Sequence, residues 1–396
     1  MSRPKLLSPP PDAKELVNYT DKYCCVIKVA ITNINAKIYW ENPLSISKCY
    51  PAVYVTKAAR VNNGRVVSCH YLETTITELD YRTLVDYYTW DKLEVKELWI
   101  YRRGYMPTPF IRGILDLYEK KTILKGDKAH ALDYMIAKNM LNAGYGMTVT
   151  NIIRMILEYS NEYGFLAPEP PSLVDEIEKY NKKYNRFLYY PWGVWVTAHV
   201  RRTLYRTILV VGSDYVYSDT DSVKCLNQAA HTKVFETYNS FIMESIQKAV
   251  ARTRIPYEKF APTNSKGKSF PIGQWEFEGT YDRFKTLGRK RYLVDESGKL
   301  SITVAGLNKG AIEYINRDGN AFEEFKDGME IPAEYAKRNI LLPIDTEKTF
   351  KGRDYLGNYF EVVTKSGAHI SPSDYKMSMS EDFRRYLTLL SMDMEY

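Results

Sequence analysis

Apolar β-branched and aromatic runs broken by polar turn residues follow the first 21 residues of the chain. Residues 23–112 are rich in β-branched and aromatic side chains, as in the segments CCVIKVAITNI and AVYVTKAARV. Turn residues such as Asn63-Gly64 interrupt these runs. Short β-branched runs separated by turn signals are typical of strands, so this pattern predicts a mixed β segment over residues 22–110.

The first 21 residues have a different composition. They contain Pro4 and a run of three prolines at positions 9–11. Proline fixes the backbone and cannot donate a main-chain hydrogen bond, so this composition predicts an extended arm rather than a helix or strand.

Over residues 112–145 the apolar positions have helical spacing, in LDLYEKKTILKG and HALDYMIAKNMLNAGYG. This spacing predicts a helical stretch. A polar stretch follows over residues 147–190, with prolines at 168, 170 and 171 and a strongly charged end. Turn-forming composition of this kind predicts an insertion between regular elements.

A helix followed by a hairpin is predicted from Pro191 onward. Proline is favoured in the first helical turn, and it precedes WGVWVTAHVRRTLYRTI. The segment LVVGSDYVYSDTDSVK over residues 209–224 then predicts an apolar strand with a turn in its middle. A longer helix is predicted over residues 232–251, and strands around QWEFEGTYDRF, GRKRYLVD and KLSITVAG.

Composition narrows the class of protein. With 45% hydrophobic and 26% charged residues the chain is expected to fold as a globular protein. It has no apolar run of the roughly 18 residues that a membrane span requires, and its first residues lack the apolar core of a secretory signal. The cysteines form an odd set without metal-type spacing: Cys24, Cys25, Cys49, Cys69 and Cys225. We therefore expect reduced thiols and a cytoplasmic location, with no membrane partner.

The sharpest chemical feature is the hexapeptide YSDTDS at residues 217–222. Alternation along an extended strand would place Asp219 and Asp221 on one face, where two crowded carboxylates favour a divalent cation. Mg²⁺ binds a few carboxylates together with substrate phosphates, and two such ions can promote phosphoryl transfer. The alternative is a polar β-turn, because Asp, Ser and Thr are common turn residues.

The second feature is KNMLNAGYG at residues 138–146. The spacing of Lys138, Asn142 and Tyr145 places an ammonium, an amide and a phenol along one helical face, which suits a nucleotide. Gly146 is expected to let the chain turn close to that ligand. The alternative is a surface lysine beside core residues Met140 and Leu141, with a glycine ending the helix.

Together these motifs resemble the family B DNA polymerases, in particular the protein-primed bacteriophage branch. Residues 138–146 resemble the family's motif K-x3-N-S-x-Y-G, with Ala143 in place of Ser, and residues 217–222 resemble Y-x-D-T-D-S. Lys290-Arg291-Tyr292 resembles the K-x-Y motif, and Val304-Ala305-Gly306 the short segment before the thumb. The likeness covers roughly residues 22–310. It implies an α+β polymerase right hand of palm, fingers and thumb.

The resemblance also implies roles for individual residues. Asp221 would be the principal metal ligand and Asp219 its neighbour, holding two Mg²⁺ ions or, in their place, Mn²⁺. Lys138, Asn142, Tyr145 and Gly146 would bind the incoming dNTP, with Lys120 and Lys121 as further triphosphate candidates. The primer end would be held by Lys290 and Tyr292. Clustered cations neutralise DNA phosphates, so the basic residues Lys285, Arg289 and Arg291 support a DNA-binding role, with a solvated charged strand as the alternative. Arg202 and Arg206 share a helical face and are interpreted as palm surface or template-backbone contacts.

Two expected parts of such a polymerase are not found in this sequence. The family's first motif, D-x2-S-L-Y-P, has only a poor echo at Cys49-Tyr50-Pro51-Ala52, and the 3′–5′ exonuclease with its D-x-E motif is missing. The economical hypothesis is a split polymerase whose second polypeptide carries both. A truncation is one alternative. The other is a non-catalytic DNA-binding accessory protein on a polymerase scaffold.

The resemblance gives a predicted division of the chain into six segments. These are an extended arm (1–21), a β insertion similar to a terminal-protein-docking segment (22–110), fingers (111–146), a second insertion similar to a strand-displacement segment (147–190), palm (191–303), and thumb with the C-terminal region (304–396). The second insertion could also be a plain solvent-facing excursion. The implied partners are primer-template DNA, dNTPs, the second polypeptide and a terminal priming protein, in the cytoplasm of a host cell if the protein is viral.

Overall fold

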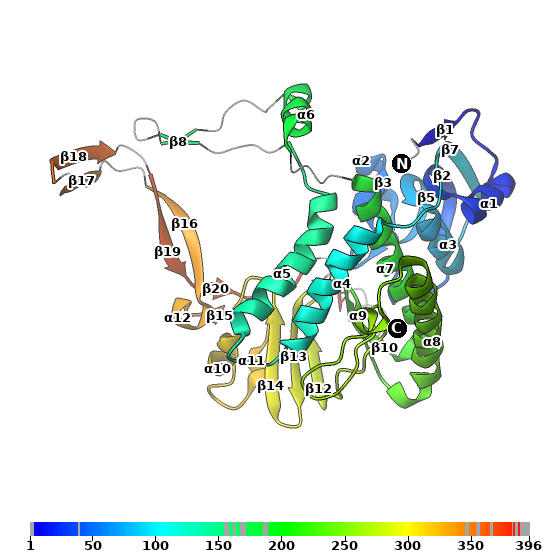
Figure 1. Cartoon of the computed structure of the whole chain (residues 1–396). Helices are drawn as coiled ribbons and strands as arrows, with labels where there is room; N and C mark the ends of the chain where they lie inside the picture. Colours follow the sequence, from blue (N-terminus) through cyan, green and yellow to red (C-terminus); the bar gives the residue numbers. More distant parts are fainter. Residues whose placement is uncertain are drawn as a thin grey trace. The chain divides into compact units, whose positions relative to one another are not determined.

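The structure is a computed structural model that describes residues 4–38, 40–153, 158–160, 164–166, 172–184, 189–344, 348–353, 357–364, 367–381, 383–384 and 387–388 (Figure 1). The chain divides into two compact units. The first comprises Met1–Val149, Leu188–Glu278 and Arg385–Tyr396, and the second comprises Thr150–Phe187 and Gly279–Arg384.

A seven-stranded antiparallel sheet forms the centre of the first unit. Its strands lie in the order β1 (Lys5–Leu7), β7 (Lys92–Tyr101), β2 (Cys24–Ala36), β5 (Arg65–Thr77) and β3 (Cys49–Tyr50), while β4 (Arg60–Asn62) pairs with β5 and β6 (Tyr88–Thr89) pairs with β2. In β2 the alternate residues Cys25, Ile27 and Val29 are fully buried. The strands predicted in this segment are therefore confirmed, and one face of the sheet is packed.

The prediction of an extended arm over residues 1–21, without a helix or strand, is wrong, because β1 (Lys5–Leu7) pairs with β7 and a helix follows. Helix α1 (Ala13–Lys22) begins directly after the prolines. The Asp12 carboxylate accepts hydrogen bonds from the backbone N–H groups of Lys14 and Glu15, both at 2.8 Å, and so caps the helix. Leu16 is fully buried in the core of the sheet. The cap and this anchor stabilise a helix that composition alone did not indicate.

Helices α3 (Glu78–Tyr87) and α7 (Tyr190–Val211) pack on the same core, which includes Leu84 of α3 and Tyr205 and Ile208 of α7. The prediction of a helix beginning near Pro191 is confirmed, with the proline in the first turn. A short helix, α2 (Ala52–Ala58), precedes β4.

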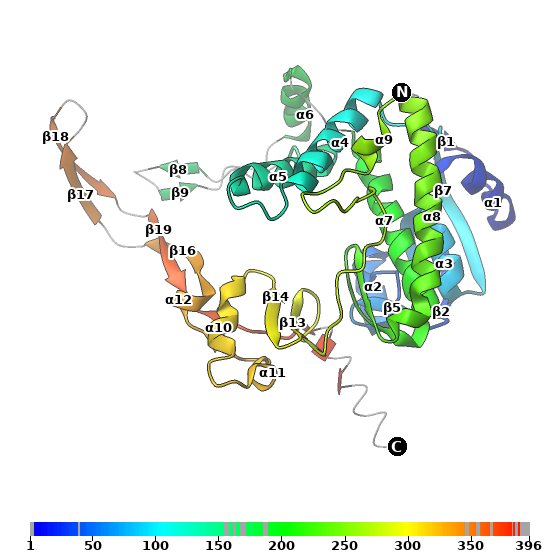
Figure 2. The same ribbon diagram turned by 60° about the horizontal axis from the view of Figure 1, so that its bottom comes forward.

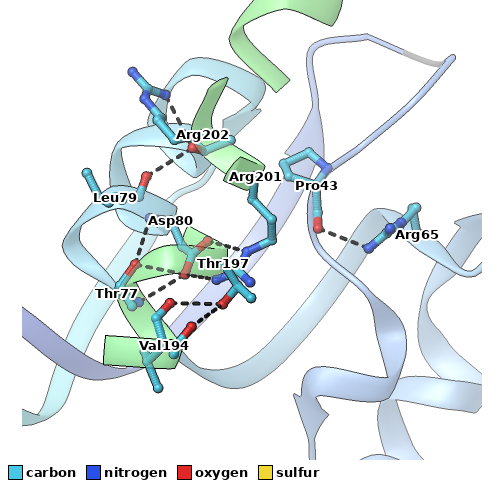
Figure 3. Close-up of polar contacts among 11 residues, drawn as sticks. Pro43, Arg65, Thr77, Leu79, Asp80, Val194, Thr197, Arg201 and Arg202 are labelled. Atoms are coloured by element: carbon cyan, nitrogen blue, oxygen red, sulfur yellow. Dashed lines mark hydrogen bonds and ion pairs between the residues drawn. The ribbon is translucent and has the colours of Figure 1, made fainter. Parts of the chain in front are cut away.

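Polar contacts join α7 to both ends of α3. Figure 3 shows Arg201 of α7 reaching Asp80, with Nε–Oδ1 and Nη2–Oδ2 distances of 2.9 Å each. Arg202 donates to the Asp86 carboxylate at 2.5 Å. A two-point arginine–carboxylate contact fixes orientation as well as distance, so α7 is held in one position against α3. Arg202 therefore takes part in an internal contact, whereas Arg206 is exposed.

A second helical group contains α4 (Thr108–Ile123), α5 (Ala131–Thr148), α8 (Gln228–Thr253) and α9 (Tyr257–Phe260). Leu115, Ile246, Ile255 and Phe260 form its core. The predicted helical stretch over 112–145 is two helices, because the chain turns at Gly126, whose φ is +90°. Helix α8 confirms the helix predicted over 232–251, and it runs beside α7 (Figures 1 and 2).

The strand predicted from residue 209 begins later. Helix α7 continues through Val211, a short 3₁₀ turn (Gly212–Asp214) follows, and only then does the hairpin of β10 (Tyr215–Asp219) and β11 (Ser222–Cys225) begin. Gly212 ends the helix with φ at +64°. Ile208 and Val211 are buried on the inner face of the helix. A short apolar run does not distinguish a buried helix from a strand, which explains the error.

The strand predicted around QWEFEGTYDRF is also misplaced, since regular pairing begins only at Arg283. The backbone of Trp275 hydrogen-bonds to a side chain instead of to a strand. Its N–H donates to Asn239 Oδ1 at 2.8 Å, and its carbonyl accepts from Asn239 Nδ2 at 2.9 Å. These bonds satisfy the main chain without a sheet.

The second unit is built on the antiparallel sheet β12 (Arg283–Thr286), β13 (Arg291–Glu296) and β14 (Lys299–Val304), which confirms the two later strand predictions. Short helices follow: η3 (Lys309–Ala311), α10 (Ile312–Ile315), α11 (Ala321–Glu324) and α12 (Ala333–Ala336). Its core includes Leu293, Ile302, Ile315, Phe325 and Ile331.

Four strand pairs and one helix complete the second unit. They are β15 (Glu330–Ile331) with β20 (Tyr375–Lys376), β16 (Arg338–Ile344) with β19 (Gly367–Ser373), β17 (Lys348–Arg353) with β18 (Tyr359–Thr364), β8 (Glu158–Ser160) with β9 (Gly164–Leu166), and α6 (Leu173–Lys182). Part of the predicted insertion at 147–190 lies outside the described residues.

The two units do not coincide with the six predicted segments. The β segment at 22–110 shares one core with α7, and the predicted palm is divided near Gly279. The functional roles given to these segments stay predictions. Within the part of the chain that the structure describes, no helix is both long and apolar enough to span a membrane.

Candidate functional site

The two aspartates of YSDTDS flank the tip of the β10–β11 hairpin. Asp219 ends β10 and pairs with Ser222, so Thr220 and Asp221 form a two-residue turn. Thr220 has φ at +57°, and the Asp221 N–H donates to the Asp219 carbonyl at 2.7 Å. The prediction that alternation along one strand aligns the carboxylates is therefore wrong. The alternative, a polar turn, is confirmed, and the metal-binding role of the two carboxylates stays a prediction.

The hairpin base is fixed by the side chain of Asp214. One carboxylate oxygen faces His231 Nε2 at 2.8 Å, and the other accepts from Asn227 Nδ2 at 3.1 Å. The hydrogen bond to His231 and that to Asn227 lower the pKa of Asp214. Leu226 N–H also donates to the Asp214 carbonyl at 2.8 Å. The start of α8 thus holds both ends of the hairpin.

The predicted nucleotide face on α5 is solvent-accessible. Lys138, Asn142 and Tyr145 are exposed, whereas Ala137 on the adjoining face is buried against the rest of the unit. The expectation that Gly146 turns the chain is wrong, because α5 continues to Thr148. The alternative with a buried Met140 is also wrong, since that side chain is 53% exposed. The predicted face is available to a ligand.

Lys121 of α4 interacts electrostatically both with the predicted nucleotide face of α5 and with the β10–β11 turn that carries Asp219 and Asp221, the aspartate turn. Its ammonium lies 5.3 Å from the centroid of the Tyr118 ring and is half-buried. Burial lowers the pKa of Lys121, and the positive charges of Lys125 and Lys138 lower it further, while Asp221 and Glu276 oppose the shift. Lys121 therefore interacts electrostatically with both Lys138 and Asp221. A set of lysine charges that influence one another is suited to binding a polyanion.

Sequence reasoning missed three members of this cluster. Tyr118 lies one helical turn before Lys121, so the i, i+3 spacing could have identified it. Lys125 follows in the same segment and carries the same charge. Glu276 approaches from a distant part of the chain, and it also accepts from Lys268 at 2.6 Å. No sequence spacing points to Glu276.

The predicted primer-binding residues lie in the second unit, around the turn between β12 and β13. Arg289 and Lys290 are exposed at this turn, where Lys290 has φ at +52°, and Tyr292 stacks on Phe284 with ring centroids 5.6 Å apart. Arg291 begins β13 and is half-buried. The predicted role of Lys285 is not supported by its environment, because its ammonium donates to the Phe322 carbonyl and burial lowers its pKa.

The donor set for metal ions is incomplete in the described residues. Asp219 is half-buried and Asp221 exposed, so both carboxylates can reach a ligand. Over the described ranges, however, no group of three or more His, Cys, Asp or Glu side chains has the arrangement of a metal site. Two hard oxygen ligands fit Mg²⁺ that is also bound by phosphates, but a full two-ion site needs further ligands. All five cysteines are free thiols, and burial raises the pKa of Cys25 and of Cys49 to about 12.

The fold is similar to that of phi29 DNA polymerase. The ternary complex of that enzyme with primer-template DNA and incoming nucleotide substrates has a TM-score of 0.56 and 15% sequence identity, covering 96% of this chain and 54% of that one. The binary complex with primer-template DNA gives 0.55 and 16%, with coverage of 95% and 54%. An orthorhombic crystal form gives 0.52 and 16%, with the same coverage.

The chain thus has the α+β fold of part of that polymerase and spans about half of its length. No protein-family model matches the chain, and no curated protein sequence matches it.

Proposed function

We propose that this chain is the nucleotidyl-transfer part of a DNA-directed DNA polymerase, which adds dNTPs to a primer 3′ end. The observation that supports the proposal is that charged residues of three elements interact electrostatically. The β10–β11 turn supplies Asp219 and Asp221, α4 supplies Lys121, and α5 supplies Lys138. Carboxylates beside clustered ammonium groups suit a metal-bound triphosphate.

In this proposal, different residues bind the triphosphate, the nascent base pair and the primer end. Lys138 and Lys121 neutralise the triphosphate. Burial and the charges of Lys125 and Lys138 lower the pKa of Lys121, and a bound anion would stabilise its charged form. Asn142 and Tyr145 lie on the exposed face of α5 next to Lys138, where they line the nascent base pair. In the second unit, Lys290 and Tyr292 hold the primer end, with Arg289 and Arg291 beside them on the DNA backbone.

Asp219 and Asp221 would hold the metal ions, Asp221 as the principal ligand. Two Mg²⁺ ions, or Mn²⁺ in their place, would activate the primer 3′-hydroxyl and stabilise the charge of the leaving pyrophosphate. The protein's own contribution is to keep both carboxylates at a tight turn whose base is fixed by Asp214. A preorganised turn avoids the cost of bringing two repelling charges together during the reaction.

A second polypeptide is part of the proposal. The described residues supply two carboxylates where a two-ion site needs more, and the chain spans 54% of the phi29 enzyme. A partner that carries the first polymerase motif and the exonuclease would complete the site. The phi29 structures include complexes with primer-template and single-stranded DNA, which supports DNA as a ligand here. A terminal priming protein and a cytoplasmic location belong to the same proposal, with roles for residues 22–110 and 147–190 in docking and strand displacement.

The experiment that tests the proposal uses a primer that ends in a dideoxynucleotide, so that binding is measured without chemistry. Affinity of the chain for this primer-template is titrated with Mg²⁺ and each dNTP in turn, with and without the polypeptide encoded next to it. The complementary dNTP should tighten binding several-fold over the other three. The Lys138→Ala variant should lose this difference, and Lys14→Ala, an exposed lysine of α1, should keep it.

The competing function is that of a non-catalytic DNA-binding accessory protein. The basic cluster at Arg289 and Lys290 would serve that function equally well. Such a protein would bind the primer-template in a salt-dependent way but would not distinguish the complementary dNTP from the others. Equal affinity with all four dNTPs, with the partner present, would therefore exclude the polymerase proposal.

A further inference from the structure

Gly193 of α7 marks an unusually close approach between two helices of the first unit. It is buried in the second turn of α7, next to the end of α5. A Cβ atom at this position would lie 2.1 Å from Val149 Cγ1 and 2.8 Å from Thr148 Oγ1. Non-bonded carbon atoms pack at roughly 3.5–4.0 Å, so an alanine would force a displacement of roughly 1.5 Å.

The obstacles on the α5 side cannot easily move away. Val149 is β-branched, and such side chains have restricted χ1 rotamers. Thr148 is only 3% exposed, and its hydroxyl donates to the Tyr145 carbonyl at 2.7 Å. A substitution at Gly193 would therefore shift the end of α5 rather than one flexible side chain.

Trp192, which precedes Gly193 in α7, packs against α4. The Trp192 ring lies 5.2 Å from the Phe110 ring of α4 and 5.1 Å from the Tyr189 ring, measured between centroids. Consecutive residues of α7 thus contact α4 through Trp192 and α5 through Gly193. The opposite end of α7 packs beside the aspartate hairpin, since Tyr205 and Ile208 share a core with Tyr215 and Val223.

These contacts make α7 the common support of the two halves of the proposed site. Lys138, Asn142 and Tyr145 lie on α5, one to three turns before the residues that touch Gly193, and a helix transmits a displacement along its length. Nucleotide transfer tolerates little misplacement, and an error of about 1 Å can reduce the rate by about a hundred-fold.

We infer that Gly193 is a positioning residue that sets the distance between the nucleotide helix α5 and the aspartate hairpin, and thereby controls affinity for the incoming dNTP. This inference rests on the proposed function. It predicts that a single added carbon atom at position 193 weakens dNTP use while leaving primer-template binding unchanged, because the primer-binding residues are on other elements.

The test compares four variants of the chain, assembled with its partner polypeptide, in steady-state primer extension. Gly193→Ala should raise KM for dNTP by about ten-fold or more, with primer-template Kd unchanged. Gly113→Ala is the matched control, because Gly113 lies within α4 with no atom near its missing Cβ, and it should behave as wild type. Val149→Ala removes the closest obstacle but leaves the Thr148 hydroxyl, so the double variant Val149→Ala/Gly193→Ala should have a dNTP KM clearly below that of Gly193→Ala and above that of wild type.

A Gly193→Ala variant that melts like wild type and keeps its KM would overturn the inference, as would a double variant without recovery. If Gly193→Ala does not fold, Val149→Ile adds a carbon from the other side of the same contact. It should then raise KM about three-fold, and an unchanged KM would overturn the inference. Failure of the proposed function is separable, because the wild-type assembly itself would then fail to extend the primer.

Discussion

At the scale of single residues, the strongest functional signal is the electrostatic environment of Lys121. The charged form of this half-buried lysine is destabilised by burial and by the like charges of Lys125 and Lys138, and both effects lower its pKa. A bound triphosphate would relieve that cost. Perturbed lysines of this kind concentrate at functional sites. Asp221 acts on the same lysine, so a carboxylate belongs to this group of interacting charges.

Two lysines in different units should have separable effects on polymerisation. Lys138→Ala should raise KM for dNTP by roughly ten-fold and leave primer-template Kd nearly unchanged, since Lys138 lies on the exposed face of α5. Lys290→Ala should do the reverse, because Lys290 lies in a basic turn suited to a phosphate backbone. Extension across a dNTP series, paired with equilibrium DNA binding, measures both quantities.

Lys14→Ala controls for the loss of a positive charge alone. Weakening of the same step to the same extent by Lys138→Ala and Lys290→Ala would show that the assignment of α5 to nucleotide and of the β12–β13 turn to primer is wrong.

At the scale of elements, the aspartate turn depends on how the base of its hairpin is fixed. The β10–β11 pair has few residues and forms no wider sheet among the described strands. Isolated two-stranded hairpins are marginally stable, so contacts at the base matter. Asp214 supplies them through His231, Asn227 and the backbone of Leu226.

Asp214→Asn should lower the thermal unfolding midpoint at pH 7 and reduce extension activity through disorder of the hairpin. The folded-state pKa of Asp214 is below its ordinary value of 3.8, so its contribution is present above about pH 4 and is lost as the pH falls through the folded-state pKa. The difference between the variant and wild type should therefore shrink below about pH 4. Melting curves over a pH series measure this, with Asp318→Asn, an exposed carboxylate, as control.

Equal melting at pH 7, or a difference that persists unchanged in acid, would show that the ionised carboxylate does not fix the hairpin.

Part of the fold could be predicted from local signals in the sequence. The start of α7, the helix α8 and the aspartate hairpin followed from Pro191, helical periodicity and turn residues, all of which are local signals. The continuation of α7 through Val211 and the helix α1 did not follow, because burial of Val211 and of Leu16 is a property of the assembled core. In the proposed site, Asp221 and Lys138 were predicted from motif spacing, and their roles stay predictions. Glu276 and the contact at Gly193 arise from tertiary packing and leave no spacing in the sequence.

At the scale of the whole molecule, the chain has the fold of about half of a phi29-type polymerase. It has a formal charge of 55 − 48 = +7, and its basic turns suit a nucleic acid. Over the described residues, no group of three or more His, Cys, Asp or Glu side chains could by itself hold a metal ion. A molecule with these properties should bind primer-template DNA by itself but should extend it poorly until a partner supplies further ligands.

The central claim is that Asp221 binds metal for nucleotide transfer, and single-turnover primer extension by the reconstituted assembly tests it most directly. Wild type should extend with Mg²⁺ once the partner is added. Asp221→Ala should abolish extension while DNA binding stays nearly intact, because losing a carboxylate removes a metal ligand and reduces repulsion of phosphate. Asp318→Ala should behave as wild type. Retention of even about a tenth of the activity by Asp221→Ala would contradict the account, since a lost principal ligand should cost far more.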